Sequence, residues 1–190
     1  MAKKKSGSNN ALFRLVGALL GVLAIVFSFI LDGVTKTVEA NIGGASSTTT
    51  TTVKLFNLMF GSPTMNSTNV TTLLGATTTT NATVSYGGGM STFALISFIA
   101  VALGVVLLVV SFLIKNKFAS FAGGALLVLG GIFVFLTLTS GADLTTTVGN
   151  STVNTAFADA FKDYKLAIGA YLYGILSIVG GALGILSSAK

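Results

Sequence analysis

The sequence predicts an all-α transmembrane fold, a left-handed four-helix bundle carrying a small extracytoplasmic antiparallel β-sheet. Of the 190 residues, 52% are hydrophobic and 8% are charged, which lies outside the usual range of soluble domains. Four apolar runs of at least 20 residues are long enough to cross a hydrocarbon layer of about 30 Å. Threonine and valine recur in the longest segment between these runs, which favours strands there.

Basic residues predict the orientation in the membrane, because cytoplasmic loops collect Lys and Arg. A basic tail at residues 1–11 precedes the first run, and a basic turn at 115–117 separates the second run from the third. Both segments are therefore expected in the cytoplasm, together with both termini of a multi-pass cell-membrane protein. The residues that carry this prediction are Lys3, Lys4, Lys5, Lys115 and Lys117.

The net charge of +6 could also indicate binding to nucleic acid. The predicted cytoplasmic side has seven basic residues and no acidic ones, which gives a charge of +7. The outer side has four basic and five acidic residues, which gives a charge of −1, and the two sides together account for the net charge of +6. The topology of a membrane protein explains this distribution. We therefore expect membrane lipids as partners, and no nucleic acid.

The first half of the chain predicts one helix and an outer loop. Residues 12–31 are expected to form the first helix. A cleaved signal peptide is the alternative, which is disfavoured because the run is longer than a typical signal core. Residues 32–91 form a Thr-rich outer loop, in which strands are predicted at 34–39, 51–60 and 81–86. A flexible Thr-rich stalk is the alternative for this loop.

The second half predicts three more helices. A helical spacing of Phe157, Phe161 and Tyr164 runs into the last apolar run, so one long helix is expected to protrude outside the membrane. The predicted segments are helices at 92–114 and 118–139 around the 115–117 turn, a second outer loop at 140–153, the long helix at 154–187 and a cytoplasmic end at 188–190.

Small residues recur in the apolar runs at steps of three and four, which lets helix backbones approach closely and favours a left-handed supercoil. The third helix carries two adjacent stripes of glycines seven residues apart, so the second stripe could contact another helix of the bundle or a neighbouring subunit. The predicted packing residues are Gly17, Gly21, Ala24, Ser28, Ser97, Ala100, Gly104, Gly124, Gly131, Ala170, Gly174, Ser177, Gly181 and Gly184.

Few groups capable of catalysis are present. The chain has no Cys and no His, which excludes thiolate sites and the commonest metal ligands and catalytic triads. Arg14 is the one charge within the apolar runs, and we expect it to reach the headgroups at the inner end of its helix. Asp159 and Asp163 are too few for a calcium site. The sequence therefore predicts no catalytic residue, metal or cofactor, and no enzyme.

Two groups of residues in the outer loops could serve interactions. An apolar patch could pack on the sheet and the helix ends or contact a partner protein, and it consists of Leu55, Phe56, Leu58, Met59 and Phe60. Four Asn-x-Ser/Thr sequences on the predicted outer side could accept glycans, and they begin at Asn66, Asn69, Asn81 and Asn150.

Four spans, a first outer loop of about 60 residues with strand character, a short inner turn and a short second outer loop resemble the layout of claudin-like tetraspan proteins. The chain lacks the Trp and Cys residues of that group's first-loop signature, so no residue role is carried over. The resemblance implies a left-handed bundle with an extracellular sheet, and lateral self-association or partner binding through the outer loops. We therefore expect a non-enzymatic protein that self-associates, scaffolds or adheres; the alternative is an accessory subunit of a channel or transporter.

Overall fold

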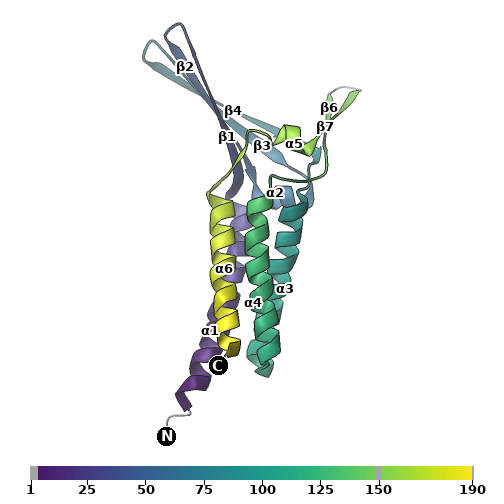
Figure 1. Cartoon of the computed structure of the whole chain (residues 1–190). Coiled ribbons are helices and arrows are strands. Elements are labelled where there is room, and N and C mark those ends of the chain that lie inside the picture. Colours follow the sequence, from purple (N-terminus) through teal and green to yellow (C-terminus); the bar gives the residue numbers. More distant parts are fainter. Residues whose placement is uncertain (1–3, 149–150, 190) are drawn as a thin grey trace.

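The computed structural model describes residues 4–148 and 151–189. Four long helices lie side by side in a bundle, and a β-sheet projects from one end of it (Figure 1). The helices are α1 (Lys4–Ile30), α3 (Thr92–Ile114), α4 (Lys117–Phe133) and α6 (Ile168–Ala189). We call the end that carries the sheet the sheet end, and the opposite end, where α3 turns into α4, the turn end.

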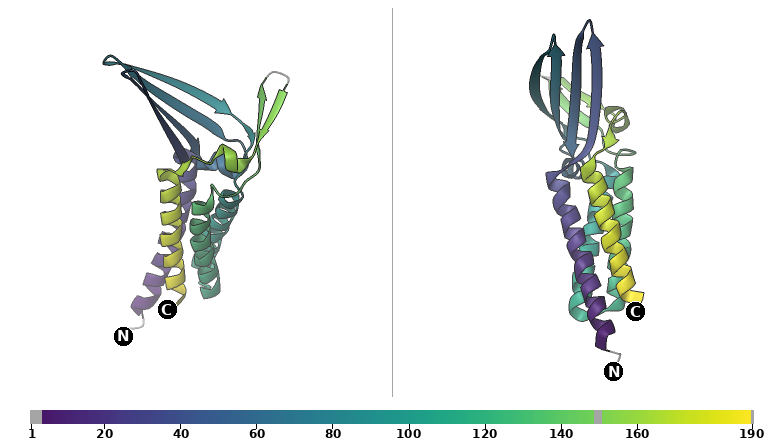
Figure 2. Two further views of the ribbon diagram at one scale, coloured as in Figure 1. Left: turned by 45° about the horizontal axis from the view of Figure 1, so that its top comes forward. Right: turned by 90° about the vertical axis from the view of Figure 1, so that its left-hand side faces the viewer.

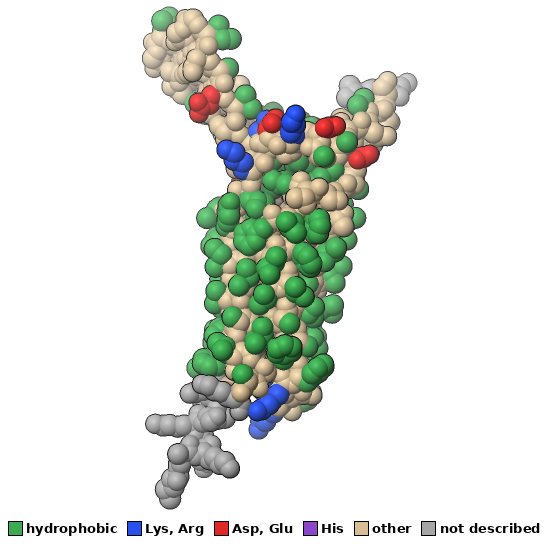
Figure 3. All heavy atoms as spheres, in the orientation of Figure 1, with side chains coloured by type: hydrophobic (Ala, Val, Ile, Leu, Met, Phe, Trp, Pro, Cys, Tyr) green, Lys and Arg blue, Asp and Glu red, His purple; other side chains and the backbone are tan. Residues whose placement is uncertain are grey.

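All four helices are long and apolar enough to cross a membrane, which is consistent with the prediction of a multi-pass protein with four spans. Large apolar side chains on all four helices are exposed, and they cover the face of the bundle seen in Figure 3, with charged side chains visible at its two ends. The spans are Asn10–Ile30, Thr92–Ile114, Lys117–Leu136 and Ile168–Ala189, the third of which includes the short 3₁₀-helix η1 (Val134–Leu136).

Small residues line the interior of the bundle. Each helix packs against two neighbours, in the cyclic order α1, α3, α4, α6. At the contact between α1 and α6, a Cβ added to Gly17 would lie 2.6 Å from the carbonyl oxygen of Gly180. A Cβ on Gly104 of α3 would likewise lie 2.8 Å from the carbonyl oxygen of Gly123 on α4. Only glycine permits these backbones to approach so closely.

The basic turn between α3 and α4 is short because its residues close both helix ends. Lys115 ends α3 in the left-handed conformation, with φ at 55°. The side-chain oxygen of Asn116 accepts hydrogen bonds from the backbone N–H groups of Phe118 at 2.8 Å and Ala119 at 3.3 Å. These bonds satisfy donors that the first turn of α4 leaves without partners.

The segment between α1 and α3 forms most of an antiparallel sheet of five strands, in the order β4-β3-β2-β1-β8. The predicted sheet is therefore present, but the all-α fold class is wrong, since the fold is mixed α/β. Alternating Thr and Val fit pleated strands, and glycines close the tight hairpins. The strands are β1 (Asp32–Ile42), β2 (Ala45–Lys54), β3 (Thr64–Leu73), β4 (Ala76–Ser85) and β8 (Lys165–Leu166).

Two details of this segment differ from the prediction. The strand expected at 51–60 ends at Lys54, and Leu55–Phe60 forms the short helix α2 instead, because Leu55, Leu58 and Met59 all turn into the protein interior. Strand β3 was not predicted. Its residues are mostly polar on both faces, so its sequence lacks the alternation of apolar and polar residues that marks a half-buried strand.

The long helix expected at 154–187 is wrong for the residues before Ile168. Chain 151–155 is strand β7 (Ser151–Thr155), which joins β5 (Gly87–Gly88) and β6 (Leu144–Val148) in a small second sheet. Helix α5 (Phe157–Ala160) makes a single turn, β8 pairs with β1, and α6 begins only at Ile168. The aromatic spacing at 157–164 reflects packing beneath the sheet and does not mark a continuous helix.

The molecule has two hydrophobic cores. One runs through the bundle and includes Leu108, Leu127 and Tyr173. The other lies beneath the base of the sheet, where Val34 and Val53 from the strands meet further apolar residues. Its remaining members are Leu58, Leu144, Phe157 and Phe161.

Candidate self-association surface

The outermost strand of the large sheet, β4, is fully open along one side. All ten residues of Ala76–Ser85 are exposed, and β4 pairs only with β3, from Thr64↔Ser85 to Leu73↔Ala76. The backbone N–H and C=O groups on its other side are therefore available to a further strand. Figure 2 shows the four long strands reaching away from the helices, so this edge is unobstructed by the bundle.

Strand β4 has none of the features that usually block an open edge. Its sequence, Ala-Thr-Thr-Thr-Thr-Asn-Ala-Thr-Val-Ser, contains no Pro and no charged residue. Soluble proteins place Lys, Pro or a bulge on such strands to prevent edge-to-edge pairing. The β-branched Thr and Val side chains also favour an extended backbone before a partner arrives.

The opposite edge, β1, is protected by contrast. At its base, β8 covers β1 through the pairs Val34↔Leu166 and Thr35↔Lys165. Further out, β1 carries Lys36 and Glu39, whose charges oppose pairing with an uncharged strand. The two long edges of one sheet therefore differ, and only β4 is both open and uncharged.

An ion pair holds the protected edge in place. Lys36 Nζ lies 2.8 Å from a carboxylate oxygen of Asp163, in the loop between α5 and β8. The hydrogen bond and the charge of Lys36 lower the pKa of Asp163. Lys36 Nζ also lies 5.9 Å from the ring centre of Tyr164, and burial raises the pKa of that phenol. Tyr164 Oη in turn donates to the sulfur of Met65 on β3 at 3.4 Å.

Hydroxyl groups stiffen the distal part of the sheet. Ser47 on β2 donates to Asn69 Oδ1 on β3 at 3.0 Å, and the hydroxyls of Thr51 and Ser67 lie 2.9 Å apart. The Thr runs therefore form ordered strands with cross-strand side-chain bonds, each of which contributes a few tenths to about 1 kcal/mol. The flexible-stalk alternative does not describe this segment.

The two hairpin tips are apolar. Gly43 and Gly44 have positive φ, as a two-residue turn of this type requires, but Leu74 also has a φ of 49° beside Gly75. Leu74 is 93% exposed and Ile42 is 79% exposed. A leucine in the left-handed region costs backbone energy, and nothing in the described chain covers it.

Helix α2 secures the sheet to the bundle. The predicted partner-contact residues Leu55, Leu58 and Met59 have no exposed surface, so they are unavailable to another protein. Phe56 stacks on Phe29 at 4.0 Å between ring centres, and Phe60 packs edge-on against Phe98 at 5.2 Å. Of the five residues predicted, only Phe60 is substantially exposed, at 47%.

The sequence-predicted glycosylation residues lie on the sheet. Asn66 and Asn69 are on β3 and Asn81 is on the open strand β4, whereas Asn150 lies outside the described residues. Asn66 Oδ1 accepts a hydrogen bond from Thr83 at 3.2 Å. The amide nitrogen, to which a glycan would be attached, takes no part in this bond.

All fourteen predicted packing residues are buried at contacts between the spans. Gly180, which forms a GxxxG pattern with Gly184 in the sequence, also packs closely, since a Cβ on it would lie 2.8 Å from the carbonyl oxygen of Gly17. On α4, the stripe of Gly123 and Gly130 faces α3, and the stripe of Gly124 and Gly131 faces α6. Both glycine stripes therefore lie inside the bundle, so the second one offers no contact for a larger partner.

Those predicted topology residues that the structure describes lie at the turn end. Lys115 and Lys117 are exposed there, and α1 begins at Lys4 on the same side, while Lys3 lies outside the described residues. No group of three or more Asp, Glu, His or Cys residues suited to a metal ion occurs in the part of the chain that the structure describes.

Comparison with known proteins gave no matching family model and no similar curated protein. The fold and the surface therefore define the class: a protein of four membrane-spanning helices that presents a five-stranded antiparallel sheet with one open, uncharged edge.

Proposed function

We propose that this chain is a non-enzymatic cell-membrane protein that self-associates through strand β4, and so acts in scaffolding or adhesion. The observation that carries the proposal is the ten-residue β4 edge, which is exposed throughout and free of charge and Pro. A second copy of the same strand is the occupant we propose. Two β4 strands pair antiparallel about a two-fold axis, which presents the same surface twice.

Several features support this reading over a heterologous partner. The strand has no charge, so two copies meet without the repulsion that like charges would cause across an interface. Where Thr faces Thr of the other copy, the two form a pair of β-branched side chains, which stabilises neighbouring strands. The distinct, charged β1 edge would limit growth of a continuous sheet, so a closed pair is expected.

The basic turn end supports a cytoplasmic position for both termini and an outer position for the sheet. The layout shared with claudin-like proteins supports the same orientation, as well as a left-handed bundle and lateral assembly. Association within one membrane would make the chain a scaffold, and association between two membranes would make it an adhesion protein.

The proposal is tested by adding one positive charge to the edge. In Thr79→Lys, two copies would each bring a lysine to the shared edge, and we expect association to fall at least about tenfold, the effect of roughly 1.4 kcal/mol. Thr68→Lys is the matched control, because Thr68 lies on the same face of the interior strand β3, opposite Asn81 of β4. It adds the same charge without touching the edge.

Purified protein in proteoliposomes provides both readouts. Cross-linking within single vesicles measures association in one membrane, and vesicle clustering measures association between membranes. Loss of either signal in Thr79→Lys with retention in Thr68→Lys supports the proposal. An equal effect of both variants, or none, contradicts it.

A further inference from the structure

Arg14 is buried at the turn end of the bundle, close to the point where the spans end. Arg14 is only 5% exposed, although it lies four residues after Asn10, the first residue of its span. A residue expected to reach freely into the headgroups is therefore enclosed by protein. Burial of a charge is costly unless a partner of opposite charge accompanies it.

The protein supplies only part of that compensation. Arg14 Nη1 donates to the carbonyl oxygen of Ser111 at 2.9 Å, near the C-terminal end of α3, where carbonyl groups carry partial negative charge. The Nε–H is buried and has no hydrogen-bond partner among the described residues. A guanidinium has five N–H donors in a planar fork, so most of its hydrogen-bonding capacity is unused by this bond.

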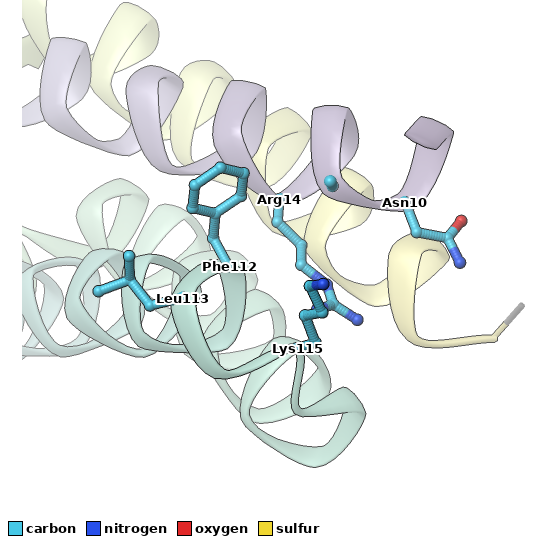
Figure 4. Close-up of a pocket in the computed structure, with 6 residues that line it drawn as sticks. Asn10, Arg14, Phe112, Leu113 and Lys115 are labelled. Atoms are coloured by element: carbon cyan, nitrogen blue, oxygen red, sulfur yellow. The ribbon is translucent and has the colours of Figure 1, made fainter. Parts of the chain in front are cut away.

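The Arg14 side chain borders a pocket of about 440 Å³ between α1 and the end of α3. Figure 4 shows Arg14 reaching from α1 toward Lys115, with Phe112 and Leu113 on the neighbouring helix. The pocket thus has two cationic groups on one side and apolar side chains on another. It is lined by Asn10, Ala11, Arg14, Phe112, Leu113 and Lys115.

No carboxylate side chain is near enough to balance these charges. All five acidic residues of the chain lie at the sheet end, across the length of the bundle (Figure 3). Among the described residues, therefore, no anionic side chain compensates Arg14, and an anion from outside the chain could do so. Asn10, whose Oδ1 is buried without a partner among the described residues, adds a further polar group to the wall.

We propose that this pocket binds the phosphate of an anionic phospholipid headgroup. Arg14 would donate to the phosphate oxygens through its remaining N–H groups, the contact for which a guanidinium is best suited. Lys115 would add a second positive charge from the turn. Phe112 and Leu113, which are 38% and 70% exposed, would contact the acyl chains beside the headgroup. The site is independent of the association proposed for the sheet.

The bond from Arg14 to Ser111 has a structural role by itself, so Arg14 variants alone do not test the ligand. Lys115→Met removes a pocket charge and leaves the Arg14 bond intact. Lys117→Met is the matched control, since it removes the same charge from the same turn but does not line the pocket. Arg14→Met serves as a third variant where it folds.

The experiment is native mass spectrometry of the full chain in detergent, with phosphatidylglycerol, phosphatidylcholine or inorganic phosphate added separately. We expect one bound phosphatidylglycerol per chain, and a loss of affinity of about tenfold or more in Lys115→Met and in Arg14→Met. Lys117→Met should bind like the unmodified chain. Phosphatidylcholine should bind more weakly, because its own choline neutralises the phosphate.

Three results would overturn the proposal. Equal losses in Lys115→Met and Lys117→Met would indicate unspecific attraction to a basic surface. Equal binding of both lipids would remove the role of net charge. Full competition by millimolar inorganic phosphate, with no gain from the lipid, would assign the pocket to a free phosphate ion and not to a headgroup.

Discussion

Gly181 of α6 and Gly124 of α4 are in backbone contact: a Cβ added to either residue would lie 2.5 Å from the carbonyl oxygen of the other. The two helices therefore meet at a distance that no other residue allows. Gly131 and Gly174 repeat this contact nearer the sheet end, where a Cβ on Gly131 would lie 2.7 Å from the carbonyl oxygen of Gly174.

Gly181→Ala should therefore destabilise the bundle by about 1–3 kcal/mol, because the added methyl group forces the helices apart. Thermal unfolding in detergent, followed by circular dichroism, measures the change. Ala182→Leu is the control: Ala182 is exposed on the same helix, so we expect a change within about 0.5 kcal/mol. Equal effects of the two variants would contradict the close packing of α4 on α6.

Leu58→Ala should destabilise the base of the sheet by about 2–5 kcal/mol, the usual cost of truncating a fully buried leucine. Hydrogen exchange would detect this as faster exchange of the β1 and β2 amides, with the spans less affected. Phe60→Ala, which truncates a half-exposed ring on the same helix, should have a smaller effect. A uniform response in the sheet and the helices would show that the two cores do not unfold separately.

Leu74→Asn should stabilise the β3–β4 hairpin by about 0.5–1 kcal/mol, since Asn tolerates the positive φ that Leu74 adopts. Chemical denaturation would measure the gain. The variant also separates the edge from the tip as surfaces of association. Unchanged association would support pairing along β4, whereas loss of association would assign that role to the exposed leucine.

The ion pair of Lys36 and Asp163 predicts a dependence on pH. Lys36 holds the pKa of Asp163 below its ordinary value, so the pair stabilises the fold above that ordinary value, and this contribution is lost as the pH falls through the lowered one. Lys36→Met should return the pKa of Asp163 toward its ordinary value, about 3.9. Carboxyl NMR titration measures it, with Lys54→Met as the control; a pKa unchanged in Lys36→Met would refute the pairing.

Association through β4 should depend little on salt, because the strand carries no charge. We expect similar cross-linking of the purified protein in 50 mM and 500 mM sodium chloride, concentrations that bracket a Debye length of about 10 Å. A steep loss at high salt would instead indicate charged residues along the β1 and β8 edge of the sheet, such as Glu39 and Lys165.

The spans could be predicted because length and apolar composition are enough to identify them. An uncharged run of sufficient length crosses a membrane regardless of the residues against which it packs. The sheet was harder. Leu55–Phe60 has the residues of a strand, but its helical turn places three large side chains between the two cores. Likewise, Phe157 and Phe161 have helical spacing because they begin and follow the single turn α5, from which both reach the same small core.

The candidate surfaces depended on pairings that no local pattern reveals. The sequence of β4 shows that it lacks charge, but only the strand order shows that it lies at an edge. Arg14 was expected to extend into the headgroups. It is enclosed instead because α3 ends opposite it and offers the carbonyl of Ser111, 97 positions further along the chain.

Helix α2 contributes to both cores, with Leu55 and Met59 packed into the bundle and Leu58 packed beneath the sheet. A short helix of six residues thus packs into both the helix bundle and the base of the sheet, with no flexible linker at that point. A pulling force applied to the strands would be transmitted directly to the spans. Mechanical load on this protein would therefore be borne in part by side-chain packing at α2, beside the direct chain connections from α1 to β1 and from β8 to α6.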